Sequence, residues 1–106
     1  MIRSVYIAGP LTSGKPMADN VGLAIDVANE LLSAGFYVFV PHTMCPALHE
    51  SHGRDYSRWM ELCFYWLLQC DAVLRLPGES KGASCEVALA RMSGIPVFAS
   101  VEEILV

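Results

Sequence analysis

The chain has 106 residues, a formal net charge of -4 and an apolar content of 54%. This length fits one domain with a single core and is too short for a second domain. Seven Lys and Arg residues scattered among eleven acidic ones form no basic stripe, which argues against binding to a nucleic-acid polymer. No apolar run approaches the roughly 18 residues that span a bilayer, and strand-like residues begin at Ile2 without a leader. We therefore expect a cytoplasmic protein that does not enter a membrane.

The first half of the chain predicts a strand, a helix and a second strand. The β-rich run Arg3–Gly9 is stopped by a Gly-Pro pair that begins a loop. Apolar residues from Val21 to Leu32 recur at spacings of three and four, which predicts an amphipathic helix that ends at Gly35. Phe36–Val40 is almost wholly apolar, as expected of a parallel strand that is buried on both faces.

The second half repeats this alternation after residues 41–54, which have no periodicity and are expected to form a loop that carries all three histidines. Beyond it we expect a helix over Asp55–Gln69, a strand over Ala72–Leu76, a helix over Gly82–Met92 and a strand over Pro96–Ala99. The side chains expected to face inward from the helix 82–92 are Cys85, Ala88, Leu89 and Met92. The remaining residues, 101–106, are enough for one helical turn.

Strands that alternate with helices predict an α/β fold, a doubly wound parallel sheet with right-handed crossovers. We expect four or five strands in the order 2-1-3-4, in a flavodoxin-like three-layer sandwich formed by residues 1–106 as a single domain. This order opens a crevice between the carboxyl ends of the first and third strands. The loops 9–16, 41–54 and 77–84 are expected to meet there.

The segment Ser80–Glu86 (S-K-G-A-S-C-E) enters a helix at this crevice. Gly82 and Ala83 allow a ligand to approach the backbone closely, and the free N–H groups of the first helical turn favour anions. We therefore expect Glu86 to stay ionised at neutral pH, on the flank of the buried helix face, where it suits a nucleophile that attacks a sugar carbon. The alternative is an acid that only helps the helix to begin.

Several motifs, in this order and spacing, resemble the nucleoside 2-deoxyribosyltransferase-like family, which includes deoxyribonucleoside 5′-monophosphate N-glycosidases. They are V-Y-I-A-G-P at 5–10, the framework from about Asp26 to the P-H at 41–42, C-D-A-V at 70–73, and S-x-G-x-x-x-E at 80–86 followed by G-I-P-V. The resemblance spans nearly the whole chain and is closest to a small branch marked by D-x-x-x-W-M, here residues 55–60.

The resemblance implies an enzyme, an N-glycosidase or a nucleoside deoxyribosyltransferase, that needs no cofactor. Glu86 would attack the anomeric carbon, form a glycosyl-enzyme intermediate and release the base, after which water or a second base takes the sugar. Tyr6 would lie near this carboxylate, Gly9 would begin the substrate loop, and His42 would lie toward the base.

In this family, the residue six positions before the nucleophile indicates whether the substrate carries a phosphate at the 5′ end of its sugar. Transferases that act on free nucleosides carry an acid there, whereas monophosphate hydrolases carry a hydroxyl. Ser80 therefore favours a 5′-monophosphate, which an acid would repel. Gly82 would offer its N–H to the phosphate, and the first loop would complete the pocket. The first-loop residues concerned are Pro10, Thr12, Ser13 and Lys15.

Cys63 departs from the family pattern, because relatives carry an Asp at this position that protonates the leaving base. A neutral thiol is a poor acid for this step. Asp55, Glu61 and His42 are near in the predicted arrangement, but none is at the matching position; Pro10 and Thr12 also replace hydrogen-bonding and cationic residues of the hydrolases. Either another group protonates the base, or the chain is a nucleotide-binding or sensing module without turnover.

Four other features have plainer interpretations. Asp71 opens its strand and so lies opposite the crevice, where a structural role is expected. The spacing His42-x-x-Cys45-x-x-x-His49-x-x-His52 could hold zinc, but nothing else marks a metal site and we expect none.

The cysteines and tryptophans are expected to be buried. The four cysteines contain no C-x-x-C pair, and three of them lie in apolar helical settings, so we expect buried free thiols rather than disulfides. Trp59 and Trp66 are expected in the core or in a subunit contact. With only 17% charged residues, we expect a homo-oligomer, at least a dimer, with Tyr56, Arg58 or Trp59 near the neighbour's site.

Overall fold

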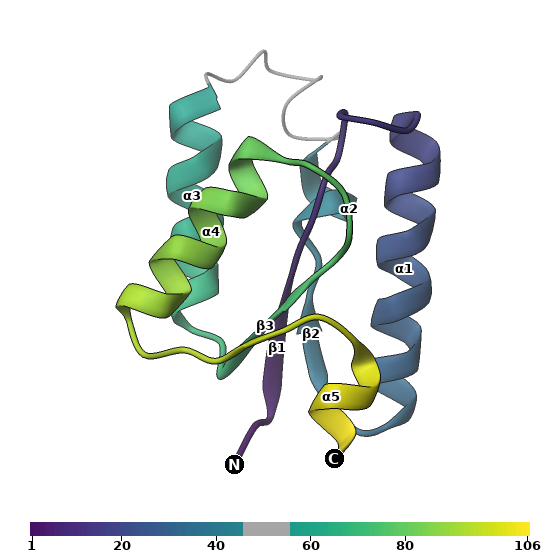
Figure 1. Cartoon of the computed structure of the whole chain (residues 1–106), viewed down its shortest axis with the longest axis vertical. Coiled ribbons are helices and arrows are strands. Elements are labelled where there is room, and N and C mark those ends of the chain that lie inside the picture. The colour runs from purple at the N-terminus through teal and green to yellow at the C-terminus, as the bar shows by residue number, and fades with distance from the viewer. Residues whose placement is uncertain (46–55) are drawn as a thin grey trace.

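A parallel sheet with the strand order β2-β1-β3-β4 forms the centre of the protein, as the sequence predicted (Figure 1). The computed structural model describes residues 1–45 and 56–106. Within them the sheet has four strands: β1 (Ser4–Ala8), β2 (Tyr37–Phe39), β3 (Ala72–Arg75) and β4 (Val97–Phe98). Tyr6, in the middle of β1, pairs with Phe39 on one side and with Val73 on the other.

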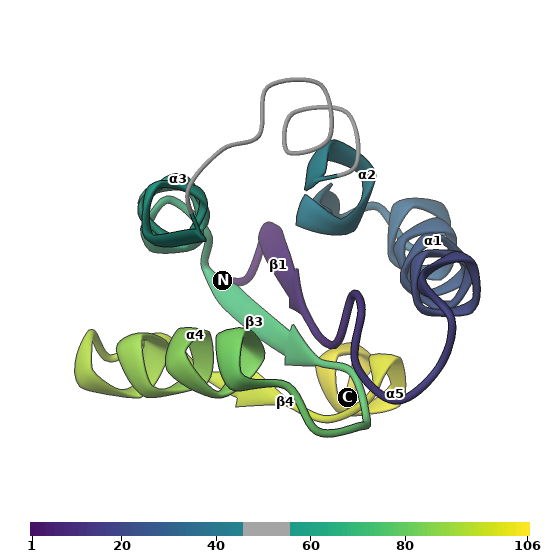
Figure 2. The same ribbon diagram turned by 90° about the horizontal axis from the view of Figure 1, so that it is seen from above.

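Helices cover both faces of this sheet. They are α1 (Met17–Ser33), α2 (Pro41–Cys45), α3 (Tyr56–Leu68), α4 (Lys81–Met92) and α5 (Val101–Leu105). Seen from above, α3 and α4 lie on one side of the strands, and α1 and α5 lie on the other (Figure 2). The three layers expected from the alternation of elements are therefore present. No helix in the described part of the chain has the length and apolar character to cross a bilayer.

Two clusters of buried side chains hold these layers together, because successive residues of a strand point to opposite faces. Val5 and Ile7 of β1 pack with residues of α1 and α5, such as Leu31 and Ile104. On the other face, Tyr6 packs with residues of α3 and α4, whose buried members are Cys63, Leu67, Ala83 and Ala90. The central strand thus presents a wholly aliphatic face to one helical layer and a tyrosine to the other.

Asp71 has the structural role that the sequence predicted. Its Oδ2 accepts hydrogen bonds from the backbone N–H groups of Arg3, at 2.8 Å, and Ser4, at 3.1 Å. These bonds lower the pKa of Asp71 and tie the start of β1 to the start of β3. This tie lies at the amino ends of the strands, away from the loops that follow them.

Two expectations about the segment after α1 are wrong. β2 is an edge strand of the described sheet, and Tyr37 is 73% exposed, so the apolar run is not buried on both faces. Residues 41–45, expected in a loop, form the helix α2. Pro41 stands at its first position, where the missing N–H costs nothing and the fixed φ favours a helix.

The inward face of α4 also differs from the expectation. Cys85, Ala88 and Met92 are exposed, whereas Ala83, Glu86 and Ala90 are buried. The prediction followed apolar spacing and placed the acid on the flank, but the acid has a partner on the sheet that makes its burial possible. Cys63, Cys70 and Cys85 are thiols that form no disulfide, as expected, although Cys85 is exposed.

Candidate active site

A cavity of about 710 Å³ opens at the carboxyl ends of the strands. Small-molecule sites commonly have volumes of roughly 300–1,000 Å³. The loop after β1, helix α2, and the first halves of α3 and α4 line it. Seven of the residues expected at the site from the sequence line this cavity: Gly9, Thr12, Ser13, His42, Ser80, Gly82 and Glu86.

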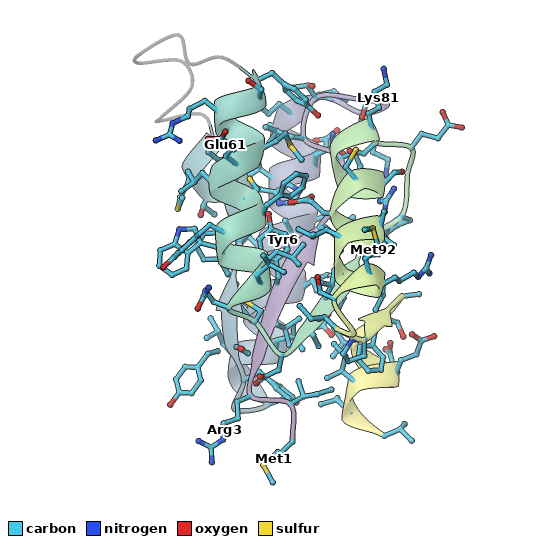
Figure 3. All side chains as sticks on the ribbon, turned by 90° about the vertical axis from the view of Figure 1, so that its left-hand side faces the viewer. Met1, Arg3, Tyr6, Glu61, Lys81 and Met92 are labelled. Atoms are coloured by element: carbon cyan, nitrogen blue, oxygen red, sulfur yellow. The ribbon has the colours of Figure 1, made fainter. Side chains whose placement is uncertain are left out.

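The carboxylate of Glu86 lies at the bottom of this cavity and is bonded to the sheet. The Tyr6 hydroxyl donates a hydrogen bond to Glu86 Oε2. Glu86 is 5% exposed, and Tyr6 is fully buried. Figure 3 shows Tyr6 between α3 and α4. One carboxylate oxygen is thus held by the central strand.

Burial raises the pKa of Glu86 to about 7, although the Tyr6 hydrogen bond and the positive charge of Arg75 lower it. A pKa of about 7 does not keep Glu86 ionised at neutral pH, so the expectation drawn from the helix N-terminus is wrong. Glu86 is the sixth residue of α4. It lies beyond the first turn, where the N–H groups favour negative charge, so desolvation dominates.

Tyr6 keeps its proton, and its ring is held in a stack. Burial, the Glu86 carboxylate and the Cys63 thiol raise the pKa of Tyr6 far above its ordinary value, so the hydroxyl remains a donor. The ring stacks on Phe39 with centroids 5.6 Å apart, and Phe39 stacks on Trp66 at 5.5 Å. Trp66, one of the two tryptophans expected in the core or in a subunit contact, is 39% exposed and supports the site from outside.

The N-terminus of α4 forms one wall of the cavity. Ser80 is the N-cap, and its Oγ accepts a hydrogen bond of 3.1 Å from the N–H of Ala83. The N–H groups of Lys81 and Gly82 belong to the first turn and have no partner within the helix. A Cβ at Gly82 would lie 3.1 Å from the Tyr56 hydroxyl, so glycine lets α3 approach α4 here.

His42 lines the cavity from α2 and is 3% exposed. Among the described residues, neither of its ring nitrogens has a hydrogen-bond partner. Burial lowers the pKa of His42, and the nearby backbone of Gly9 and Pro10 offsets only part of this effect, so the imidazole is neutral at pH 7. A neutral imidazole offers one donor and one acceptor, and leaving a buried polar group unpaired costs about 1–3 kcal/mol. A bound ligand with polar edges would remove this cost.

Three residues expected at the site are not part of the cavity lining. Tyr6 is fully buried and reaches the site only through its hydrogen bond to Glu86. Lys15 is exposed, and Pro10 is buried against Gly78. The lysine that lines the cavity is Lys81, at the N-terminal end of α4 (Figure 3). Lys81 belongs to the segment 80–86 that the sequence singled out, but no role was predicted for it. Its position directly before Gly82 is the signal that could have indicated one.

Sequence reasoning also missed the apolar walls. Met17, Met60 and Leu11 line the cavity, together with Trp59 and Tyr56, which we expected near a neighbour's site. The signal for Met60 in the sequence is the W-M pair at 59–60, part of the motif D-x-x-x-W-M. An apolar wall with aromatic rings suits a planar base better than it suits a sugar.

The residues considered as proton donors for the leaving base do not all lie at the cavity. Cys63, at the position where the family resemblance implied an acid, is buried and lines the cavity. Glu61 is exposed and pairs with Arg58 at 2.6 Å, so it is outside the cavity lining. Asp55, His49, His52 and the side chain of Cys45 lie outside the described residues. Within the described part, no three His, Cys, Asp or Glu side chains are grouped to hold a metal ion.

Comparisons with known proteins agree with this fold. Residues 3–99 match the family described as "Domain of unknown function (DUF4406)". A 2-deoxyribosyltransferase from Bacillus psychrosaccharolyticus is similar in structure, with a TM-score of 0.62 and 22% identity over 89% of this chain and 69% of that chain. A conserved protein from Enterococcus faecalis V583 has a TM-score of 0.66 and 23% identity over 92% of this chain and 62% of that chain. No curated protein matches the sequence.

Replacement of Glu86 by Gln should stabilise the folded protein above neutral pH. Because the folded pKa of Glu86 is raised from 4.5 to about 7, the native state binds the extra proton between these values, and stability falls as the pH rises through them. Glu86→Gln removes this loss, which amounts to at most about 3 kcal/mol. Urea unfolding should give the variant a higher midpoint at about pH 8 and an equal one below about pH 4.5. Equal midpoints at both pH values would contradict the burial cost assigned to this carboxylate.

Proposed function

Since the chain belongs to the DUF4406 family, described as a domain of unknown function, we propose a function from the chemistry of its own cavity. Residues 1–106 act as one domain that cleaves or transfers the N-glycosidic bond of a nucleoside or a nucleoside 5′-monophosphate. The observation that carries this proposal is a buried carboxylate, Glu86, bonded to Tyr6 at the bottom of a cavity lined by aromatic and thioether side chains. The fold shared with a 2-deoxyribosyltransferase supports it.

The proposed chemistry is a double displacement at the anomeric carbon. Ionised Glu86 attacks with Oε1, a bond forms between this oxygen and C1′, and the bond from C1′ to the base nitrogen breaks with its electrons passing to the base. The Tyr6 hydroxyl holds Oε2 and keeps the carboxylate in place during the attack. Water, or a second base, then takes the sugar and frees Glu86 with retention of configuration.

The leaving base needs a proton, and Cys63 is poorly suited to supply it. His42 is the polar group that lies in the same cavity without a partner among the described residues, and its neutral imidazole can bond to the base. If no group protonates the base, the protein binds the nucleotide without cleaving it. The thiol at position 63 is the observation that favours this second function, a nucleotide-binding or sensing module.

The 5′ end of the ligand would lie at the N-terminus of α4. The free N–H groups of its first turn attract anions, and Gly82 lets an oxygen reach the backbone. Ser80 offers its hydroxyl hydrogen while its oxygen caps the helix, and Lys81 adds a positive charge at the cavity edge. Thr12 and Ser13 of the first loop also line the cavity, and the Ser13 hydroxyl donates a hydrogen bond of 2.9 Å to the Glu79 carbonyl, next to Ser80. This arrangement favours a 5′-monophosphate over a free nucleoside.

The test of catalysis is a panel of nucleosides and 5′-monophosphates, with free base measured by chromatography. Loss of a covalent nucleophile lowers turnover by several orders of magnitude, so Glu86→Gln should nearly abolish base release and leave ligand binding almost unchanged. Glu61→Gln, which neutralises an exposed acid outside the cavity lining, is the matched control and should keep full activity. Base release at the wild-type rate by Glu86→Gln would refute the role of Glu86 as the nucleophile. Wild-type protein that binds a monophosphate and releases no base would establish the binding module instead.

A second prediction tests where the phosphate lies. Ser80→Asp keeps an N-cap oxygen for Ala83 but adds a negative charge, so it should weaken 5′-monophosphate binding by about 1–3 kcal/mol, or roughly 5- to 150-fold. Free nucleosides should lose much less affinity. Ser80→Asn keeps the cap without the charge and serves as the control. Calorimetric titration measures both ligand classes, and an equal loss for both would place the phosphate elsewhere.

We also propose that the chain forms a homo-oligomer through α3. Tyr65, on this helix, is 58% exposed, and Trp66 and Leu68 are exposed beside it, which leaves an aromatic surface that a second copy would cover. Tyr65→Glu should shift the mass measured by light scattering at micromolar concentration toward the monomer. Ile25→Glu, at an exposed apolar position on α1 across the sheet, should leave the mass unchanged. A wild-type monomer under these conditions would refute the proposal.

A further inference from the structure

Arg75 is the last residue of β3 and lies on the same face of the sheet as Tyr6. It pairs with Ala8 in the register between β1 and β3, two residues beyond the pair formed by Tyr6 and Val73. Because side chains alternate along a strand, Arg75 points to the layer that contains α4 and Glu86. No sequence motif marks this residue as functional.

The guanidinium of Arg75 binds the turn that leads from β3 to α4. One of its amino groups donates to the carbonyl of Leu76, and the other donates to the carbonyl of Gly78 at 2.9 Å. Gly78 has a φ of +107°, a conformation that favours glycine, and packs on Pro10 of the first loop. The fork of a single arginine therefore fixes the turn two residues before Ser80, the N-cap of α4.

Arg75 also acts on Glu86 through its charge. The groups that act on Glu86 are Tyr6 from β1, Tyr56 from α3 and Arg75 from β3. Cys63 of α3 lies beside Tyr6 and lines the same cavity. Of these only Arg75 is a cation, and its charge lowers the pKa of Glu86 against the effect of burial. His42 from α2 lines the same cavity and is neutral, because burial lowers its pKa.

We propose that Arg75 is a positioning residue for this site, which fixes the turn before Ser80 and keeps a positive charge near Glu86. One side chain would thus set both the shape of the phosphate end and the ionisation of the nucleophile. The two effects can be tested separately. The turn is held by two hydrogen bonds from the guanidinium group, whereas the ionisation of Glu86 responds only to the positive charge. The effect of Arg75 on catalysis rests on the proposed function, but its effects on the turn and on the ionisation of Glu86 do not.

Arg91 provides a matched control. Arg75 and Arg91 line a second groove of about 470 Å³ between α4 and β4, so both are arginines of the same surface. Arg91 is not a donor to the turn, and its charge is not among those that act on Glu86. A general effect of removing positive charge from this surface would appear in both Arg75→Gln and Arg91→Gln.

The experiment measures the ionisation of Glu86 in ligand-free protein by carbon NMR of its side-chain carboxyl, identified by its loss in Glu86→Gln. Arg75→Gln should move the titration midpoint of Glu86 upward, because a nearby cation no longer stabilises the ionised carboxylate. Arg75→Lys should keep the midpoint near the wild-type value, since it keeps the charge. Arg91→Gln should also leave the midpoint unchanged. An unchanged midpoint in Arg75→Gln, or an equal rise in Arg91→Gln, would overturn the electrostatic part.

Amide exchange reports on the turn independently. The N–H of Ala83 is protected by Ser80 Oγ, and loosening the turn should speed its exchange roughly three- to tenfold in both Arg75→Gln and Arg75→Lys. Protection equal to that of the wild type in Arg75→Lys would overturn the positioning part. Neither readout requires turnover. If the protein is an enzyme, the acidic limb of its pH profile should follow the midpoint of Glu86 in Arg75→Gln, while failure to release any base would refute only the proposed function.

Discussion

The hydrogen bond between Tyr6 and Glu86 is the interaction on which the arrangement of the sheet and α4 depends. A carboxyl group removed from water must find a partner, and this partner stands on the central strand. The bond fixes which face of α4 turns inward, and that face carries Ala83 and Ala90 on either side of the acid. Small residues at those positions let the helix lie close to the sheet. The same face of α4 therefore provides both the polar contact and the close packing.

A carboxyl held in this way is costly for the folded protein, since its pKa of about 7 shows that burial outweighs the favourable contacts. The interpretation in which Glu86 only helps α4 to begin does not fit, because an acid for that purpose belongs in the first turn, and α4 has none there. His42 adds a second unfavourable group to the same cavity, with two ring nitrogens that lack partners among the described residues. Two buried polar groups around one cavity are typical of a site shaped for a ligand.

Much of the fold was predictable from the sequence, because the alternation of strand and helix patterns restricts the sheet to few topologies, and the order 2-1-3-4 follows from them. The gathering of Glu86, Ser80 and His42 was predictable for the same reason, since loops after parallel strands meet at one edge. The inward face of α4 was not, because apolar periodicity assumes that acids face water. The raised pKa of Glu86 and the role of Arg75 depend on side-chain contacts between distant segments, which no local pattern records.

The thiol of Cys63 has a consequence for Glu86 that differs from its weakness as an acid. It lies beside the Tyr6 hydroxyl, in the layer that also holds Glu86. A carboxylate at this position would repel the charge of Glu86 and raise a pKa that burial has already raised to about 7. A neutral thiol avoids this repulsion, so the ionised form of Glu86 stays accessible near neutral pH. The thiol at position 63 thus preserves the group proposed to attack the sugar, and the proton for the leaving base then has to come from a group other than Cys63.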